Sequence, residues 1–118
     1  MIENNFDICQ TRDIHSDKIE SARHNMPSEK ALRQTSEMFK VLSDCTRLKI
    51  MQALSITELC VCDLCEVLDM NSSAVSHQLR ILRGSGLVRF RREGKNVYYS
   101  LQDIYVQDLI SIALQQAG

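Results

Sequence analysis

Apolar residues recur at helical spacing through most of the chain after Pro27, its only proline. A helix is expected where apolar residues return every three or four positions behind a capping residue. Four such segments are residues 28–42, a helix capped by Ser43-Asp44 that includes Leu48, Met51 and Leu54, a helix from an N-cap at Thr57 to about Asp69, and residues 103–116. The chain is therefore expected to be mainly helical.

A further helix, expected to begin after Asn71 as its N-cap, has two distinct faces. Val75, Leu79 and Leu82 fall at positions i, i+4 and i+7 and form an apolar stripe. The opposite face is polar and basic and carries Ser73, Ser76, His77, Arg80 and Arg83, and Gly84 supplies a stop. A short helix, a tight turn at Met70-Asn71 and a second helix with a basic outer face predict a helix-turn-helix.

Two strands are expected after this helix, over residues 87–92 and 96–101, which are rich in Val, Phe and Tyr. Glu93-Gly94-Lys95 between them predicts a hairpin turn. A basic hairpin directly after a helix-turn-helix is a wing that can lie along the DNA backbone. The predicted fold is mainly α with a small β-hairpin, a winged helix-turn-helix.

The N-terminal residues differ from the rest of the chain. Residues 1–27 show no sustained apolar period, and we expect a flexible arm with a short helical piece over residues 17–23. Residues 28–118 are expected to form the DNA-binding and dimerisation domain. No stretch approaches the roughly eighteen apolar residues that a membrane span needs, and residues 1–14 are too polar for a secretory signal. No membrane association is expected, and the expected location is the cytoplasm.

Charge is segregated along the chain. Residues 71–95 hold six Lys or Arg against one Glu, a net charge of +5, although the whole chain has a net charge of −1. A basic block in an acidic chain is typical of a nucleic-acid surface. The residues expected to contact DNA are Ser73, Ser76, His77 and Gln78 at base edges or nearby phosphates, and Arg80, Arg89, Arg91, Arg92 and Lys95 mainly at the backbone.

Three thiols, Cys60, Cys62 and Cys65, lie within six residues just before the predicted helix-turn-helix. An odd total of five cysteines favours ligands over a disulfide framework. In a regular helix, residues two apart point to nearly opposite sides, so one ion could hold Cys60 and Cys62 only where the helix begins. A helix start also favours thiolates through its unpaired N–H groups.

The N-terminal arm holds further candidate metal ligands. Cys9 and His15 are the candidates there, and Asp7 or Asp13 could serve instead of the histidine. Cys65 is either a third thiolate ligand or a small core residue. Soft thiolates select Cd(II), Pb(II), Zn(II) or Cu(I) over Mg(II) or Ca(II).

Residues from about 28 to 116 resemble the ArsR/SmtB family of winged-helix metal-sensing repressors. The matching motifs are Phe39-Lys40-Val41-Leu42-Ser43-Asp44, Thr46-Arg47-Leu48, Glu58 to Leu64, Ser72 to Arg80, and Gly94-Lys95 with Tyr98-Tyr99 and Leu101. The resemblance implies a homodimer, packed through its first and last helices, that binds operator DNA without metal and releases it with metal. It also implies that Cys60 and Cys62 bind the ion together with arm ligands contributed across the dimer.

The resemblance does not determine which metal ion is the inducer. Arsenite-sensing relatives carry a third cysteine at the spacing of Cys65, so an arsenite- or antimonite-responsive repressor, or a Cu(I)-responsive one, is the alternative. A second family site on the last helix is not expected, because Tyr105 and Gln116 stand where that site has histidines.

Two other classes of protein are disfavoured. A thiol–disulfide enzyme would show C-x-x-C near a βαβ pattern, and no acid/base pair accompanies the thiols here. A metal buffer without DNA binding would not need the basic segment. The chain is expected not to be an enzyme and to have no small-molecule substrate.

Overall fold

The computed structural model describes residues 14–118, and contacts divide the chain into two units at residues 33 and 34. The first unit contains α1 (Ser16–His24), in which no residue is buried. This helix confirms the short helical piece expected over residues 17–23. The helix α2 (Glu29–Leu42) begins in the first unit and ends in the second.

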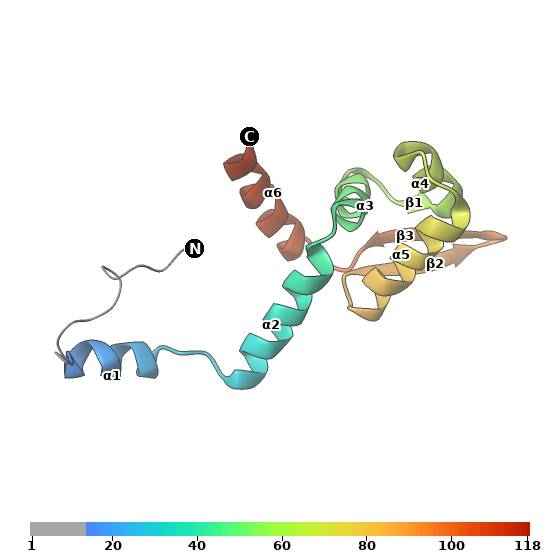
Figure 1. The fold of residues 1–118 in the computed structure, drawn as a ribbon. Helices are drawn as coiled ribbons and strands as arrows, with labels where there is room; N and C mark the ends of the chain where they lie inside the picture. The colour runs from blue at the N-terminus through green and yellow to red at the C-terminus, as the bar shows by residue number, and fades with distance from the viewer. Residues whose placement is uncertain (1–13) are drawn as a thin grey trace. The chain divides into compact units, whose positions relative to one another are not determined.

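The second unit is a winged helix-turn-helix, as predicted. Its helices and strands are α3 (Cys45–Ile56), β1 (Leu59–Cys60), α4 (Val61–Leu68), α5 (Ser72–Gly84), β2 (Val88–Glu93), β3 (Asn96–Leu101) and α6 (Tyr105–Ala117), together with the end of α2. The strands form one antiparallel sheet in the order β1-β3-β2 (Figure 1). The hairpin of β2 and β3, with the turn at Gly94-Lys95, is the wing.

Two predicted helix caps are confirmed. The carboxylate of Asp44 accepts a hydrogen bond of 3.0 Å from the backbone N–H of Arg47, so α3 begins where the sequence predicts. The side chain of Asn71 accepts one of 2.8 Å from Ala74 at the start of α5. The second cap fixes the turn between α4 and α5.

The predicted start of α4 was wrong. Thr57 is the C-cap of α3, and α4 begins at Val61 with Cys60 as its N-cap. Residues 59 and 60 instead form β1, where Leu59 pairs with Tyr99 and Cys60 with Tyr98. The carboxylate of Asp63 accepts a hydrogen bond of 3.1 Å from the backbone N–H of Cys60. Hydrogen bonding with the side chain of Cys60, and then with its backbone, lowers the pKa of the Asp63 carboxyl. Strand pairing and this bond together hold the chain extended until Cys60.

The core lies between α3, α4, α5 and the sheet. Val75, Leu79 and Leu82 of α5 are buried, which confirms the predicted apolar stripe. They pack in one cluster with buried residues of other elements, including Ile50, Met51, Leu64, Leu87 and Val88. Burial of this kind is the dominant favourable contribution to folding and holds α5 against the sheet.

A candidate DNA interface beside a thiol-bearing helix start

The outer face of α5, here called the recognition face, consists of Ser73, Ser76, His77, Gln78 and Arg80. Ser73, His77 and Arg80 are exposed, whereas Ser76 and Gln78 are half-buried. The buried stripe of α5 lies on its other side, so the recognition face is turned outward. The three exposed side chains are open to a DNA groove, and the contacts of the recognition face with DNA stay a prediction.

Gln78 is held in place by an arginine from another helix. The Arg47 guanidinium donates a hydrogen bond of 2.8 Å from Nε to Oε1 of Gln78, and Nη1 donates one of 3.2 Å to the backbone carbonyl of Val41. This bond uses the amide oxygen of Gln78, so its two amide N–H donors could still reach a base edge. Arg47 is thus a positioning residue, and only its place in a family motif marked it in the sequence.

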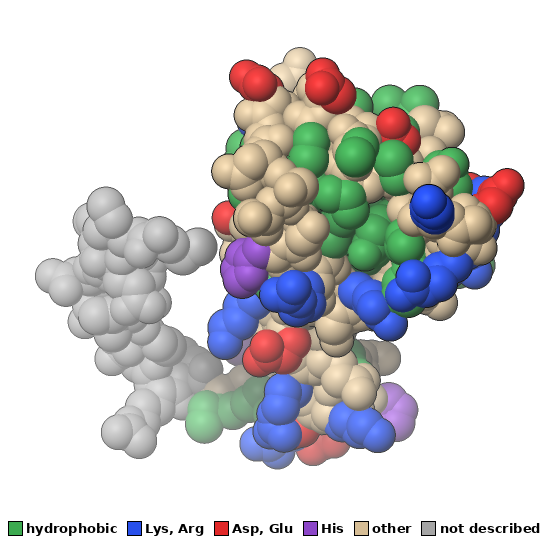
Figure 2. Space-filling model, turned by 90° about the vertical axis from the view of Figure 1, so that its right-hand side faces the viewer, with side chains coloured by type: hydrophobic (Ala, Val, Ile, Leu, Met, Phe, Trp, Pro, Cys, Tyr) green, Lys and Arg blue, Asp and Glu red, His purple; other side chains and the backbone are tan. Residues whose placement is uncertain are grey.

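The wing presents its basic residues at the surface. Arg89, Arg91, Arg92 and Lys95 are all exposed. Figure 2, which looks from the side of the wing turn, shows basic side chains gathered along one border of the winged unit. The guanidinium of Arg83 stacks 4.0 Å from the centre of the Phe90 ring, which ties the end of α5 to β2. The end of the recognition helix and the wing are therefore in direct contact.

Arg91 differs from the other wing cations, because carboxylates already engage it. Its Nε and Nη2 donate to Glu58, with the shortest contact 2.7 Å, and its Nη1 donates to Glu93. The hydrogen bonds from Arg91 lower the pKa of Glu58, and those to Glu58 and then Glu93 raise the pKa of Arg91. A phosphate could bind the Nε and Nη2 edge of Arg91 only by displacing Glu58.

The three thiols occupy different environments at the start of α4. Cys62 is exposed, Cys60 is half-buried, and Cys65 is half-buried against the core. Cys60 has an extended backbone, with φ −86° and ψ 174°. The geometry that separates residues two apart in a helix therefore does not apply to Cys60 and Cys62. The two thiols also line a hollow of about 230 Å³ that the wing turn borders through Lys95, Asn96 and Val97.

Of the other predicted metal ligands, the structure describes only His15. Cys9 lies outside the described residues, as do Asp7 and Asp13. His15 is exposed at the start of α1, in the first unit. Within residues 14–118, no three His, Cys, Asp or Glu side chains converge to form a metal site. The pair Cys60 and Cys62 nevertheless suits a thiophilic ion, since Cys60 is the extended N-cap of α4 and Cys62 lies in its first turn.

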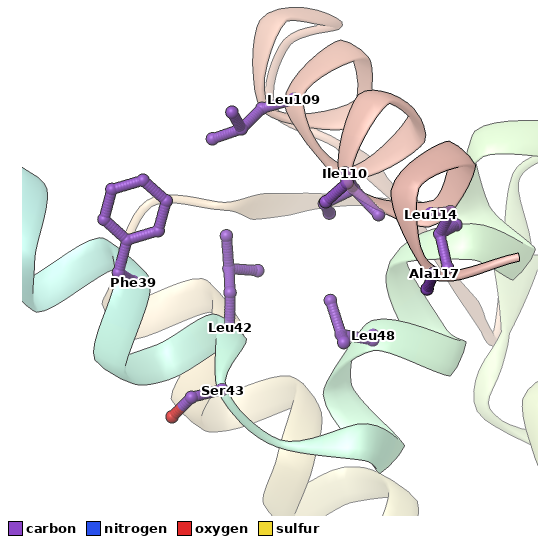
Figure 3. Close-up of a pocket in the computed structure, with 9 residues that line it drawn as sticks. Phe39, Leu42, Ser43, Leu48, Leu109, Ile110, Leu114 and Ala117 are labelled. Atoms are coloured by element: carbon purple, nitrogen blue, oxygen red, sulfur yellow. The ribbon is translucent and has the colours of Figure 1, made fainter. Parts of the chain in front are cut away.

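An apolar groove lies between α2, α3 and α6, on another face of the second unit. Leu42, Leu48 and Ile110 form its floor, and Phe39, Leu109 and Leu114 point into it from two helices (Figure 3). Phe39 is 50% exposed, Leu109 38% and Leu114 46%, so the groove is open in a single chain. Part of the apolar surface of α6 is therefore not buried within one chain. None of the helices in residues 14–118 is long and apolar enough to cross a membrane.

Comparison with known proteins identifies the family. Residues 44–89 match the family model described as bacterial regulatory protein, arsR family. The chain is 44% identical to a transcriptional repressor SmtB homolog of Synechocystis over 86% of this chain and 77% of that protein. It is 40% identical to a cadmium resistance transcriptional regulatory protein CadC homolog of Staphylococcus aureus, over 91% of this chain and 88% of that protein.

Solved structures similar to this chain have the same winged helix-turn-helix fold. A homodimeric winged helix-turn-helix DNA-binding domain of Mycobacterium bovis is 30% identical, with a TM-score of 0.70 over 79% of this chain and 88% of that one. The related proteins are transcriptional regulators and not enzymes, as the sequence predicts. From its recognition face, its wing and these matches, the chain belongs to the ArsR/SmtB family of winged helix-turn-helix transcriptional repressors.

Proposed function

We propose that this protein is a homodimeric repressor that binds operator DNA without metal and leaves it when a thiophilic ion of the Cd(II), Pb(II) or Zn(II) class binds Cys60 and Cys62. One observation carries the proposal. Cys60 ends a strand of the wing sheet and caps the helix that leads directly into α5. A change at the two thiols therefore acts where the wing and the recognition helix meet. The relative named as a cadmium resistance regulator supports this class of ion.

The ligands assigned to the site are Cys60 and Cys62, joined by Cys9 and His15 from the arm. When bound, the ion supplies positive charge and directional bonds that fix thiolates in one arrangement. Cys65 packs against the core, which favours two helix-start thiols with arm ligands over three thiols of one chain. A response to arsenite, antimonite or Cu(I) is the alternative that metal titration would detect.

The DNA surface assigned to the protein is the recognition face together with the wing. Arg89→Ala should weaken binding to operator and to random duplex alike and flatten the salt dependence by about one unit, since a phosphate contact is lost. Gln78→Ala should weaken operator binding by about 1–3 kcal/mol and leave random duplex nearly unaffected, because a base contact is lost. Fluorescence anisotropy over a salt series measures both. Unchanged operator affinity in both variants would rule out this surface.

The arm ligands are assigned across the dimer, and this assignment can be tested by counting sites. Mixed dimers are made from one Cys9→Ser chain and one Cys60→Ser/Cys62→Ser chain, and Cd(II) is titrated by its thiolate charge-transfer absorption. Sites shared between subunits should leave one intact site in each mixed dimer. Sites within a subunit would leave none, which would contradict the assignment. Unmixed dimers of each variant serve as the controls with no intact site.

A further inference from the structure

A row of three residues crosses the sheet from the thiols to the wing. Tyr98 of β3 pairs with Cys60 of β1 on one side and with Arg91 of β2 on the other. Directly paired residues of an antiparallel sheet point to the same face. The guanidinium of Arg91 accordingly lies 4.9 Å from the centre of the Tyr98 ring. A candidate metal ligand and a basic wing residue are thus separated by one strand on the same face of the sheet.

The carboxylate of Glu58 contacts Arg91, the residue at the wing end of this row. Glu58 lies two residues before Cys60, and its two oxygens accept hydrogen bonds of 2.7 to 3.0 Å from Nε and Nη2 of Arg91. These two residues are 33 positions apart in the sequence, so the contact links separate parts of the sheet. Bidentate pairing of this kind fixes the orientation of a guanidinium as well as its position.

Pairing with Glu58 distinguishes Arg91 from the other basic residues of the wing. Arg89, Arg92 and Lys95 have no salt bridge to any residue that the structure describes, whereas all three nitrogens of the Arg91 guanidinium face carboxylates. An operator phosphate that binds Arg91 in a bidentate manner through Nε and Nη2 would compete with Glu58 for these donors. Arg91 therefore has two alternative partners, one inside the protein and one on DNA.

We propose that Glu58 and Arg91 form a latch that withholds a wing arginine from operator phosphates and that is tightened when Cys60 binds metal. The inference rests on the proposed function and adds a route to the wing that bypasses the recognition helix. Cys60 held by an ion keeps the short strand β1 in one place, so Glu58 loses less freedom on pairing with Arg91. Bound DNA favours the opposite state, in which Arg91 leaves Glu58 and contacts a phosphate. By linkage, each ligand favours its own state of the latch and weakens the other ligand.

The test compares Glu58→Gln with Glu66→Gln, an exposed carboxylate of α4 whose loss changes the net charge equally. Operator affinity is measured by anisotropy over a salt series, with and without Cd(II). Without metal, Glu58→Gln should bind operator several-fold more tightly than Glu66→Gln. Its salt dependence should be steeper by about one unit, because one more phosphate is contacted. The loss of operator affinity on adding Cd(II) should be smaller by about threefold or more than in the wild type, where coupled sites typically give about 5- to 150-fold.

A double-mutant cycle isolates the pair. With Arg91→Gln already present, Glu58→Gln should change neither operator affinity nor salt dependence, because no latched arginine remains to be freed. Cd(II) affinity without DNA, read from charge-transfer absorption, should stay within about threefold of the wild type in Glu58→Gln, since coupled sites keep their own ligands.

The latch is wrong if Glu58→Gln and Glu66→Gln behave alike, or if the two substitutions of the cycle are additive. Either result would leave the proposed function intact, provided that the wild type still leaves its operator in Cd(II). A wild-type protein that ignores Cd(II), Pb(II) and Zn(II) would instead overturn the proposed function, and the metal-dependent part of the latch with it.

Discussion

Cys60→Ser and Cys62→Ser are each expected to yield a repressor that stays on its operator when Cd(II) or Pb(II) is added. Serine keeps the size of the side chain but provides no thiolate, so the two-thiol core of the site is lost. Neither thiol belongs to the recognition face, and serine is also a favoured N-cap at the position of Cys60, so metal-free operator affinity should stay within about twofold of the wild type. Anisotropy with and without metal measures both effects.

Other thiols of the chain provide graded controls. Cys45 is an exposed thiol of α3, and Cys45→Ser should respond to metal like the wild type. Cys65→Ser should change the response little, unless arsenite is the inducer. Cys9→Ser should keep some metal affinity and respond less. Release of Cys62→Ser from DNA by metal would exclude the site, and tighter operator binding in the presence of metal would reverse the mechanism.

The helix-turn-helix could be predicted from the sequence because local signals fix it. Val75, Leu79 and Leu82 repeat at the helical period, and Asn71 caps the helix through a residue three positions later. Each of these signals lies within one segment of the chain. Periodicity and capping are therefore enough to place α5, and burial of its stripe follows.

The start of α4 could not be predicted in the same way. β1 is only two residues long, too short to show an alternating pattern, and its partner β3 comes almost forty positions later in the chain. Thr57 is a good N-cap by residue type, so a local rule selected it over Cys60. The pairing with β3 decides the boundary, and it also explains why Cys60 has an extended backbone.

Two contacts that hold residues of the candidate site in place could not be predicted from any local sequence pattern. Arg47 reaches Gln78 across 31 positions, and Glu58 reaches Arg91 across 33. The sequence marked Arg91 as a phosphate ligand because its charge and its place on the wing were visible, whereas its carboxylate partners were not. The long-range pairing thus gives Arg91 a partner within the protein that its own segment could not indicate.

We propose the apolar groove between α2, α3 and α6 as the dimer interface, and a charge placed in it is the other substitution with a large expected effect. Phe39 is half exposed and points into the groove between α2 and α6, where Leu109 and Leu114 are also open (Figure 3). Phe39→Glu should leave a single chain folded, because Phe39 is not among the core residues. A two-fold interface would receive the charge twice, since each copy supplies the same patch.

The substituted protein is therefore expected to be a monomer that binds a full operator at least about a hundredfold more weakly than the wild type. Each unpaired carboxylate placed in an apolar interface costs several kcal/mol, and about 1.4 kcal/mol corresponds to a tenfold change in affinity. Sedimentation velocity measures the mass, circular dichroism checks the fold, and anisotropy on full and half operators measures binding. Ile56→Glu is the matched control, because Ile56 is 83% exposed and lies outside this groove. A dimeric Phe39→Glu protein with wild-type operator affinity would show that the groove between α2 and α6 is not the surface through which two copies read the DNA.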